Sequence, residues 1–329
     1  MSCPSEVTWH FRRPPRAGIV NRMSIIEVHD VHKRYGEVPA LRGVSFDVTR
    51  GEVFCLLGPN GAGKTTITEI LEGHRLPSSG SVSVLGHDPG RGDRDMRARI
   101  GVVLQSSGIE ENLTVGELLE MHGRWYPRSL SPAHLIELVE LDAKADTRAG
   151  ELSGGQRRRL DLALGLVGDP DVLFLDEPTT GFDPHARRHA WSTVRTLCET
   201  GKTVFLTTHF MDEAQFLADR VAVMANGQIV ACGPPAALGG RDELPTEIRF
   251  TLPANVGVGE LPALPGAAVS EERDGVLVTT ADGIAAAHTI TGWALERTVE
   301  LTRFSVSQPT LEDVYLALTE TATASETTS

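Results

Sequence analysis

The chain has 329 residues, of which 40% are hydrophobic, and this length suits two domains better than one. Acidic residues outnumber basic ones by 44 to 31, and the resulting formal charge of −13 disfavours general binding to nucleic acid or to anionic membrane surfaces. No apolar run approaches the ~18 to 20 residues that cross a bilayer, so we expect any action at a membrane to go through a partner.

The first 22 residues differ in composition from the rest of the chain. They hold four arginines against a single acid, Glu6, together with three prolines, and they lack the apolar core of a secretory signal. A second methionine, Met23, directly precedes the first strand-like run. We expect either a disordered basic extension over residues 1–22 or a chain that starts at Met23.

From Ile25 to about Pro235, short β-branched runs alternate with helix-like segments. Continuous apolar runs of this kind are typical of strands that are buried on both faces. The predicted strands are Ile25–Val31, Val53–Leu57, Ile100–Leu104, Val172–Leu175, Val204–Thr207 and Val221–Met224. The predicted helices are Lys64–Glu72, Val115–Gly123, Gly155–Val167, His185–Cys198 and Met211–Ala218. This alternation predicts an α/β fold with a largely parallel sheet, in which ligands bind at the carboxyl ends of the strands.

A Gly/Pro-rich hinge between Gly233 and Gly240 predicts a domain boundary. Beyond it, the predicted strands are Glu247–Leu252, Val276–Thr280 and Val299–Val306, and the predicted helices are Ile284–Arg297 and Thr310–Leu318. We therefore predict a main domain at residues 23–240, a small C-terminal α+β domain at 241–319 and a disordered tail at 320–329. The part from Glu247 onward holds 12 acids and 4 bases, so it carries −8 of the total charge.

The segment GPNGAGKTT lies between the predicted strand Val53–Leu57 and a helix that begins at Lys64. It matches the pattern G-x-x-x-x-G-K-[ST], in which glycines let main-chain N–H groups surround phosphate oxygens at a positive helix end. We expect Lys64 to reach the β- and γ-phosphates of a nucleotide and the Thr65 hydroxyl to coordinate Mg²⁺. The expected phosphate-binding residues are Gly58, Pro59, Asn60, Gly61, Ala62, Gly63, Lys64, Thr65 and Thr66.

The segment VLFLDEP places two carboxylates, Asp176 and Glu177, at the end of a hydrophobic strand. Magnesium keeps several waters and needs few protein carboxylates, so we expect Asp176 to bind it directly or through water. Glu177 is then placed to accept a proton from the attacking water. An acidic pair after a strand is more often a solvated turn, but its combination with the glycine loop favours a catalytic function.

The segment LSGGQ, Leu152 to Gln156, precedes a basic, apolar helix. Taken alone, it is a helix start with Ser153 as the N-cap. Between a phosphate loop and an LFLDEP strand, however, it resembles the signature motif of ABC ATPases. The resemblance extends from Ile25 to about Pro235, and it implies the P-loop NTPase fold with a helical subdomain and the hydrolysis of ATP with Mg²⁺.

The same resemblance implies roles for further residues. Tyr35 matches the aromatic residue that stacks on adenine, although a half-buried core tyrosine is an alternative. Gln105 matches the glutamine that contacts Mg²⁺ and senses the membrane subunit, and Asp183 matches the loop that crosses the dimer interface. His209 matches the switch histidine at the γ-phosphate.

The resemblance also implies a dimer. In this family, ATP on the phosphate loop of one subunit is covered by the signature motif of the other. The covering residues here are Ser153, Gly154, Gly155 and Gln156. Because the chain carries one phosphate loop and one signature, it implies either a homodimer or a pseudo-symmetric dimer with a related subunit.

Two segments narrow the branch of the family. TTHFMDEA (Thr207–Ala214) and QPTLEDVYLALT (Gln308–Thr319) resemble the daunorubicin-resistance type of exporter ATPase, which works with a separate ABC-2 permease. This implies an energy-coupling subunit at the cytoplasmic face of the cell membrane, cytosolic when unassembled, for the efflux of a drug, an antibiotic or a lipid-like molecule. Trp125 and Tyr126 lie in the segment that meets the permease, where core packing and interface are equally open.

Other kinds of ABC ATPase act without transport. The DNA-repair kind inserts long coiled coils between phosphate loop and signature, and the segment 66–151 is too short for them. The ribosome kind carries two cassettes, whereas this chain has one, and its acidic charge disfavours a nucleic-acid partner. A non-enzymatic scaffold is disfavoured because the candidate catalytic residues are all present. An importer ATPase remains an alternative, since its catalytic core would look the same.

Overall fold

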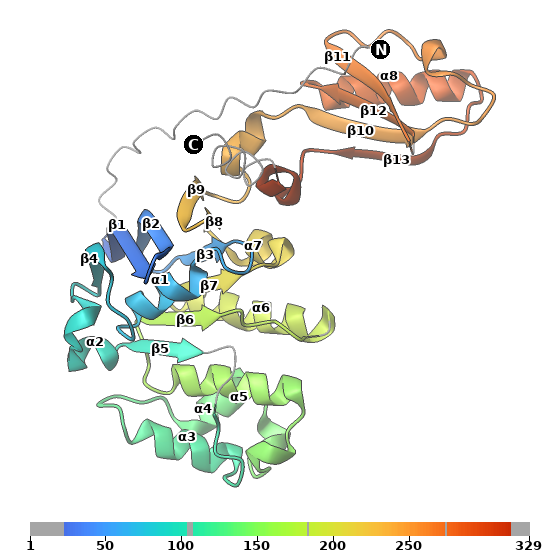
Figure 1. Ribbon diagram of the computed structural model, residues 1–329. Helices are drawn as coiled ribbons and strands as arrows, with labels where there is room; N and C mark the ends of the chain where they lie inside the picture. The colour runs from blue at the N-terminus through green and yellow to red at the C-terminus, as the bar shows by residue number, and fades with distance from the viewer. Residues whose placement is uncertain (1–22, 104–107, 183, 274, 317–329) are drawn as a thin grey trace. The chain divides into compact units, whose positions relative to one another are not determined.

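The structure is a computed structural model that describes residues 23–103, 108–182, 184–273 and 275–316 (Figure 1). These residues form two compact units that divide between Pro235 and Ala236. Each unit has its own sheets and its own buried core, which confirms the predicted α/β class with a small α+β unit at the C-terminal end. The predicted domain limits stay predictions, and the predicted extension and tail lie outside the described residues.

The first unit is built on a six-stranded sheet with the order β5-β6-β7-β3-β8-β9. Neighbouring strands are parallel except for the antiparallel pair β8–β9. The strands are β3 (Val53–Leu57), β5 (Ile100–Val103), β6 (Val172–Asp176), β7 (Thr203–Thr208), β8 (Arg220–Ala225) and β9 (Gln228–Gly233). All residues of β3 and β7 are buried, as expected for central strands with both faces covered. The five predicted strands of this sheet agree with the observed ones to within one residue, and the edge strand β9 is not predicted.

A separate antiparallel sheet with the order β2-β1-β4 is not predicted by the βα alternation. Its strands are β1 (Ser24–Tyr35), β2 (Val38–Thr49) and β4 (Ser79–Val84). In this sheet, only part of β1 is a continuous apolar run. Buried residues in β2 are interrupted by exposed ones, and the first three residues of β4 are exposed, so neither strand gives a clear apolar pattern. One core joins both sheets: the ring centroid of Phe54 lies 5.1 Å from that of Phe46 and 5.7 Å from that of Phe205.

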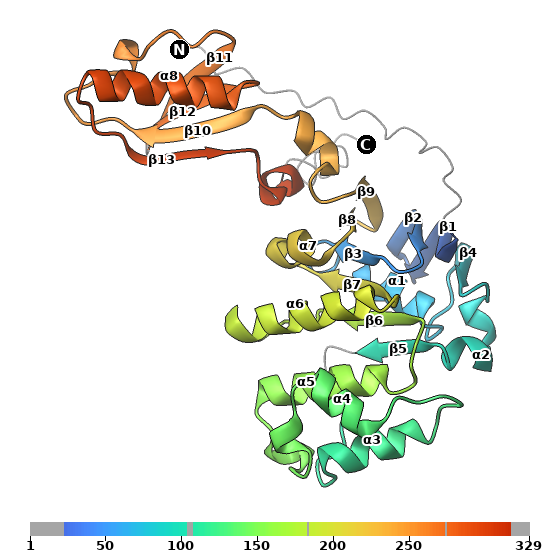
Figure 2. The same ribbon diagram turned by 180° about the vertical axis from the view of Figure 1, so that it is seen from behind.

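Helix α1 (Lys64–Leu71) contributes Ile67, Ile70 and Leu71 to the same core, so it packs against both sheets. The other helices of this unit are α2 (Arg94–Arg97), α3 (Val115–Gly123), α4 (Pro132–Leu138), α5 (Gly154–Leu166), α6 (Pro184–Glu199) and α7 (Met211–Leu217). Short 3₁₀ turns lie at Pro89–Arg91, Asp142–Lys144 and Ala149–Glu151. Helices α3, α4 and α5 contact one another and form the helical subdomain next to β5 in both views (Figures 1 and 2).

The second unit is an antiparallel sheet with the order β11-β12-β10-β13 and helix α8 packed against it. The elements are β10 (Thr246–Thr251), β11 (Ala267–Glu272), β12 (Gly275–Thr280), α8 (Gly283–Glu296) and β13 (Thr302–Ser307). Turns of 3₁₀ helix lie at Leu238–Glu243 and Val258–Glu260, and residues 311–316 are helical. Its core is centred on Ile248, Val278 and Ile290.

One predicted strand of the second unit has the wrong start, and one observed strand is not predicted. Strand β13 begins at Thr302 rather than Val299, because the N–H of Val299 donates to the Ala294 carbonyl and closes the end of α8. Thr298 has a positive φ of 53°, which turns the chain out of the helix. Strand β11 is missing from the prediction, since most of its residues are exposed and give no apolar period.

Candidate active site

The phosphate loop, Gly58–Thr66, connects the end of β3 to α1. Its three glycines are required by geometry: a Cβ on Gly58 would lie 2.4 Å from the Met224 carbonyl oxygen, and Gly61 and Gly63 have positive φ values of 81° and 104°. Gly63 is the N-cap of α1, and no side chain caps this helix. Within the described residues, the main-chain N–H groups of Gly63, Lys64 and Thr65 have no hydrogen-bond partner. The loop thus presents N–H donors at a positive helix end, where an anion fits.

The Lys64 side chain folds back over this loop. Its Nζ donates to the carbonyl oxygens of Gly58 at 2.8 Å and Pro59 at 3.2 Å, and it lies 3.7 Å from Glu177 Oε1. Burial lowers the pKa of the ammonium, and the neighbouring carboxylates of Glu177 and Asp176 partly offset this shift. Lys64 therefore joins the phosphate loop to the end of β6.

The two carboxylates after β6 are held by Thr207 of the adjacent strand β7. The Thr207 hydroxyl donates to Asp176 Oδ1. The main-chain N–H of Glu177 donates to the carbonyl and hydroxyl oxygens of Thr207 at 3.1 and 3.2 Å. Glu177 has a φ of 47°, a left-handed conformation that is uncommon outside glycine, so the residue depends on these contacts to stay in place.

His209 follows β7, and its Nδ1 lies 3.1 Å from Glu177 Oε1. This contact is an ion-pair distance and not a hydrogen bond, and Nδ1 has no hydrogen-bond partner in the described part of the chain. The imidazole packs on Phe210 with ring centroids 4.1 Å apart, and the Arg187 guanidinium lies 4.3 Å from the same phenyl ring. Ring contacts therefore orient His209 toward Glu177.

The strand order explains why residues far apart in the sequence meet. Strands β6, β7 and β3 are adjacent and parallel, so their carboxyl ends lie at one edge of the sheet. Lys64 follows β3, Glu177 follows β6 and His209 follows β7, and the first and last both approach the same oxygen of Glu177. The structure thus brings together four of the predicted site residues: Lys64, Asp176, Glu177 and His209.

The signature segment begins α5. The Ser153 hydroxyl accepts from the Gln156 N–H at 3.3 Å, and Gln156 Oε1 accepts from the Ser153 N–H at 2.9 Å. This reciprocal pair is a capping box, which confirms that Ser153 is the N-cap.

The glycines of the signature segment face open space. A Cβ added to Gly154 or Gly155 would meet nothing within 4 Å in this chain. No hydrogen bond or ion pair between described residues joins the signature to the phosphate loop Gly58–Thr66. The two motifs therefore do not form one bonded site within a single copy.

Arg158 of α5 is a site residue that the motifs do not reveal. Its guanidinium donates to the carbonyl oxygens of Asp176 at 3.2 Å, Glu177 at 3.3 Å and Pro178 at 3.1 Å. The side chain is 12% exposed, and burial lowers its pKa. It lies in a run of three arginines, and nothing in that run distinguishes the buried one.

The remaining predicted residues are placed differently. Tyr35 lies at the end of β1 and is 41% exposed, so it is not a core tyrosine. Lys33 Nζ and the Arg75 guanidinium lie 5.6 and 5.1 Å from its ring centroid, as in cation–π contacts. Gln105 and Asp183 lie outside the described residues.

Trp125 lies at the surface, and Tyr126 is half-buried. Trp125 is 68% exposed, and its ring centroid lies 4.5 Å from that of His122. Tyr126 packs against the main chain at Gly168, where an added Cβ would lie 2.4 Å from the tyrosine ring.

Within the described residues, no helix combines the length and the apolarity needed to span a bilayer.

Two family models match the chain. The model described as "ABC transporter" matches residues 41–180. The model described as "ABC transporter domain-containing protein-like, C-terminal domain" matches residues 246–310. A Nod factor export ATP-binding protein I from Burkholderia lata is 47% identical over 218 residues, which cover 65% of this chain and 72% of that protein. The chain belongs to the ABC transporter family. A second Nod factor export ATP-binding protein I, from Ralstonia nicotianae, is 45% identical and covers 69% of this chain and 72% of its own length.

Solved structures show the same fold. cbiO1 from Clostridium perfringens, part of the ABC transporter complex cbiONQ, has a TM-score of 0.59 and 27% identity, and covers 65% of this chain and 89% of its own. A dimeric ATP-binding cassette in a post-hydrolysis state with ADP and Pi has a TM-score of 0.58 and 26% identity, and covers 64% of this chain and 98% of its own.

These findings confirm the predicted enzyme class. The chain is an ABC ATPase, an ATP-binding and ATP-hydrolysing subunit of a transporter. ABC ATPase subunits of this kind dimerise and work with transmembrane partners.

Proposed function

We propose that this ABC ATPase is the energy-coupling subunit of an exporter, which acts at the cytoplasmic face of the cell membrane through a separate ABC-2 permease. The observation that carries the proposal is the 47% identity to a Nod factor export ATP-binding protein I over 218 residues. The segments Thr207–Ala214 and Gln308–Thr319 support it, because they resemble the daunorubicin-resistance type of exporter ATPase. The cargo is then a drug, an antibiotic or a lipid-like molecule.

The phosphate loop fits the nucleotide that this function requires. Its N–H groups at Gly63, Lys64 and Thr65 have no partner in the described chain, and the helix end behind them is positive. Lys64 Nζ lies over the loop carbonyls, so its ammonium would face the β- and γ-phosphates. The main chain of this loop would hold the phosphates, and Lys64 would neutralise them.

The oxygen groups near the loop fit Mg²⁺. The Thr65 hydroxyl is exposed, and the Asp176 carboxylate is oriented by Thr207. One hydroxyl and one carboxylate suit an ion that keeps several waters, and Gln105 would add a third oxygen by the family resemblance. When bound, the ion neutralises charge that develops on the phosphates.

Glu177 would act as the general base and accept the proton of the attacking water. Its carboxyl lies near both Lys64 and His209. His209 would contact the γ-phosphate and fix the orientation of this carboxyl. Thr207 and Arg158 hold the main chain of Glu177 from two sides, so the general base is fixed before ATP binds.

The open space at the signature supports an ATP sandwich. A Cβ added to either glycine of the signature would meet no atom of this chain within 4 Å. The first turn of α5 offers main-chain N–H groups beside these glycines. A second subunit's nucleotide would bind there, with Ser153, Gly154, Gly155, Gln156 and Asp183 at the interface. The partner ATPase is a second copy or a related subunit.

Transport direction is the test of this proposal. The ATPase is purified with its permease, reconstituted with the ATP sites outside proteoliposomes, and given ATP with daunorubicin as a fluorescent probe. We expect ATP-dependent accumulation in the lumen, and none with Glu177→Gln. ATP-dependent loss of preloaded probe from the lumen would identify an importer instead, and ATP hydrolysis by the reconstituted complex with no probe movement in either direction would contradict the proposed export.

A further inference from the structure

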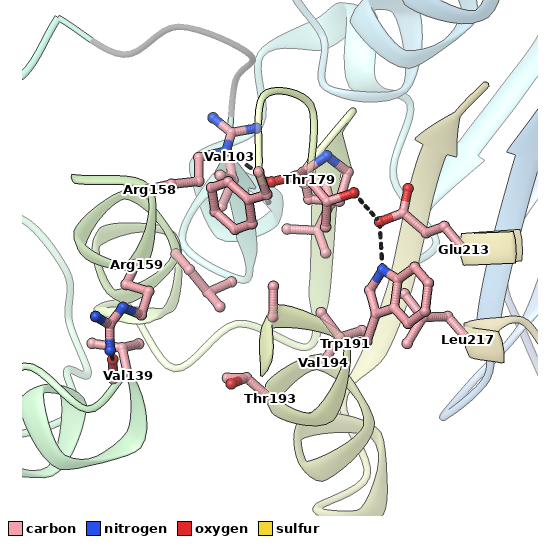
Figure 3. A pocket seen from close by; sticks show the side chains of 15 residues that line it. Val103, Val139, Arg158, Arg159, Thr179, Trp191, Thr193, Val194, Glu213 and Leu217 are labelled. Carbon is pink, nitrogen blue, oxygen red and sulfur yellow. Dashed lines mark hydrogen bonds between the residues drawn. The ribbon is translucent and has the colours of Figure 1, made fainter. Parts of the chain in front are cut away.

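A buried carboxyl on α7 receives hydrogen bonds from two other elements. Glu213 is 0% exposed. Its Oε1 accepts from the Thr179 hydroxyl at 2.8 Å and from the Trp191 indole N–H at 3.0 Å. Figure 3 shows both bonds meeting at one oxygen, with Thr179 in the loop after β6 and Trp191 on α6. One acceptor atom therefore ties three segments together.

Two of these segments continue directly from residues of the candidate active site. Thr179 stands two residues after Glu177, and α7 begins two residues after His209. Because Glu177 holds a left-handed φ of 47°, its conformation depends on the contacts that anchor the chain on either side. Thr207 anchors its main chain directly, and Glu213 anchors the loop that follows through Thr179.

Helix α6 gives this anchor a firm support. Trp191 stacks on Phe216 of α7 with ring centroids 5.1 Å apart, and Arg195 donates to the Phe216 carbonyl at 2.7 Å. Near the other end of α7, Arg187 forms an ion pair with Asp212 at 3.2 Å. These contacts fix α6 and α7 to each other on both sides of the buried carboxyl.

The surroundings of this carboxyl are otherwise mostly apolar. The crevice beside it is lined by residues that include Leu162, Leu175, Val194 and Leu217. Burial raises the pKa of Glu213, and hydrogen bonds from hydroxyl and indole groups partly offset this shift. An apolar side chain of similar size would avoid the cost of burying a carboxyl. The specific contribution of Glu213 is therefore directional, as an acceptor that two donors share.

We propose that Glu213 is a positioning residue for ATP hydrolysis: its Oε1 holds the loop after Glu177 against α7, so that Glu177 keeps its place beside His209. Glu213 acts through Thr179 and not on the nucleotide, so it sets kcat and leaves the KM for ATP unchanged. The inference rests on the proposed roles of Glu177 and His209.

The test is a series of variants of the full chain, assayed for ATP hydrolysis with kcat and KM separated. Glu213→Leu removes the acceptor, and we expect kcat to fall about 10- to 100-fold with KM within about 2-fold. Glu213→Gln keeps an oxygen that can accept both bonds, so we expect it to restore kcat to within about 3-fold of the native value. Thr179→Val removes only one donor and should reproduce most of the loss seen with Glu213→Leu.

Glu52 provides a matched control. It is also a buried acid, 7% exposed, whose pKa is raised by burial, and it pairs with Arg220 at 3.1 Å, away from the residues of the site. Glu52→Leu should lower the melting temperature and leave kcat as it is. This variant separates a general loss of stability from a loss of positioning.

Each outcome decides between the two roles. If Glu213→Leu and Thr179→Val lower only the melting temperature, as Glu52→Leu does, Glu213 is a core residue and the proposal is wrong. If Glu213→Gln is as slow as Glu213→Leu, the charge matters and not the shared acceptor, and the proposal is also wrong. Glu177→Gln is assayed alongside these variants. If Glu177→Gln keeps full turnover, the proposed general base is wrong. If Glu177→Gln loses turnover while the Glu213 variants keep a normal kcat, only the inference about Glu213 is wrong.

Discussion

Lys64 Nζ lies 3.7 Å from Glu177 Oε1, and the two side chains are only 6% and 13% exposed. The pair joins two motifs that are more than a hundred residues apart in the sequence. Opposite charges at this separation in a partly desolvated site stabilise each other strongly. The lysine of the phosphate loop and the proposed general base therefore form one unit, in which each side chain orients the other.

Replacing either residue of this pair should affect a different step. Lys64→Ala removes the cation that faces the phosphates, and we expect ATP binding to become too weak to measure by isothermal titration. Glu177→Gln keeps the size of the side chain and removes the proton acceptor, so ATP should bind normally while kcat falls about 100-fold or more. Tight ATP binding by Lys64→Ala would contradict the role given to the phosphate loop.

His209 should matter through its contact with Glu177. We expect His209→Gln to lower kcat about 100-fold, because Nδ1 lies 3.1 Å from Glu177 Oε1 and no other histidine approaches that carboxyl among the described residues. His122→Gln, on α3, is the control and should retain full activity. Equal kcat values for the two variants in a coupled ATPase assay would remove His209 from the mechanism.

Arg158 should couple the helical subdomain to the active site. Arg158→Met removes the guanidinium that donates to three carbonyl oxygens at 176–178, and we expect it to cost about 2–4 kcal/mol in the free energy of unfolding and to lower kcat. Arg159 is the neighbouring control, since it donates to the carbonyl of Glu140 at 2.9 Å within the helical subdomain. Arg159→Met should lower stability without lowering kcat, as measured by urea unfolding and steady-state hydrolysis.

The parts of this site that could be predicted from the sequence are those whose chemistry is local. The phosphate loop needs the glycines Gly58 and Gly63 close to Lys64. The two carboxylates follow one another at the end of one strand. Each motif is therefore contained in its own short segment of the sequence. The central strands of the large sheet are equally local, because each is a continuous buried run.

The parts that could not be predicted depend on contacts between distant segments. Arg158 contacts carbonyl groups about twenty residues away, and Glu213 receives its bonds from residues 34 and 22 positions earlier. Arg158 has the same residue type as Arg157, and its side chain is 12% exposed against 35%. Glu213 follows another acid, Asp212, whose side chain is 58% exposed, so burial and not charge sets Glu213 apart. The edge strands β2, β4 and β11 escape prediction for a related reason, because their exposed residues interrupt the apolar pattern.

Glu72, at the C-terminal end of α1, is a buried carboxyl whose side chain is 3% exposed. Burial raises its pKa to about 8, and the carboxylates of Asp176 and Glu69 add to this shift. His74 Nδ1 lies 3.2 Å from its Oε2, while Oε1 has no hydrogen-bond partner among the described residues. At neutral pH this group is therefore largely protonated in the folded protein.

Stability should fall as the pH rises toward and past the folded-state pKa of Glu72. The ordinary pKa of a glutamate is 4.5 and the folded value is about 8, so between these pH values the unfolded chain binds fewer protons and loses them first. The free-energy cost of ionising the buried group grows across this window and reaches its full value, a few kcal/mol, above it.

Glu72→Gln removes this cost, and we expect its melting temperature to exceed that of the native protein by more at pH 8.5 than at pH 5. Glu120→Gln, which removes a carboxyl on α3 that is 61% exposed and pairs with Arg124, is the control at every pH. A gain from Glu72→Gln that does not grow with pH, measured relative to this control, would show that Glu72 is already ionised in the fold.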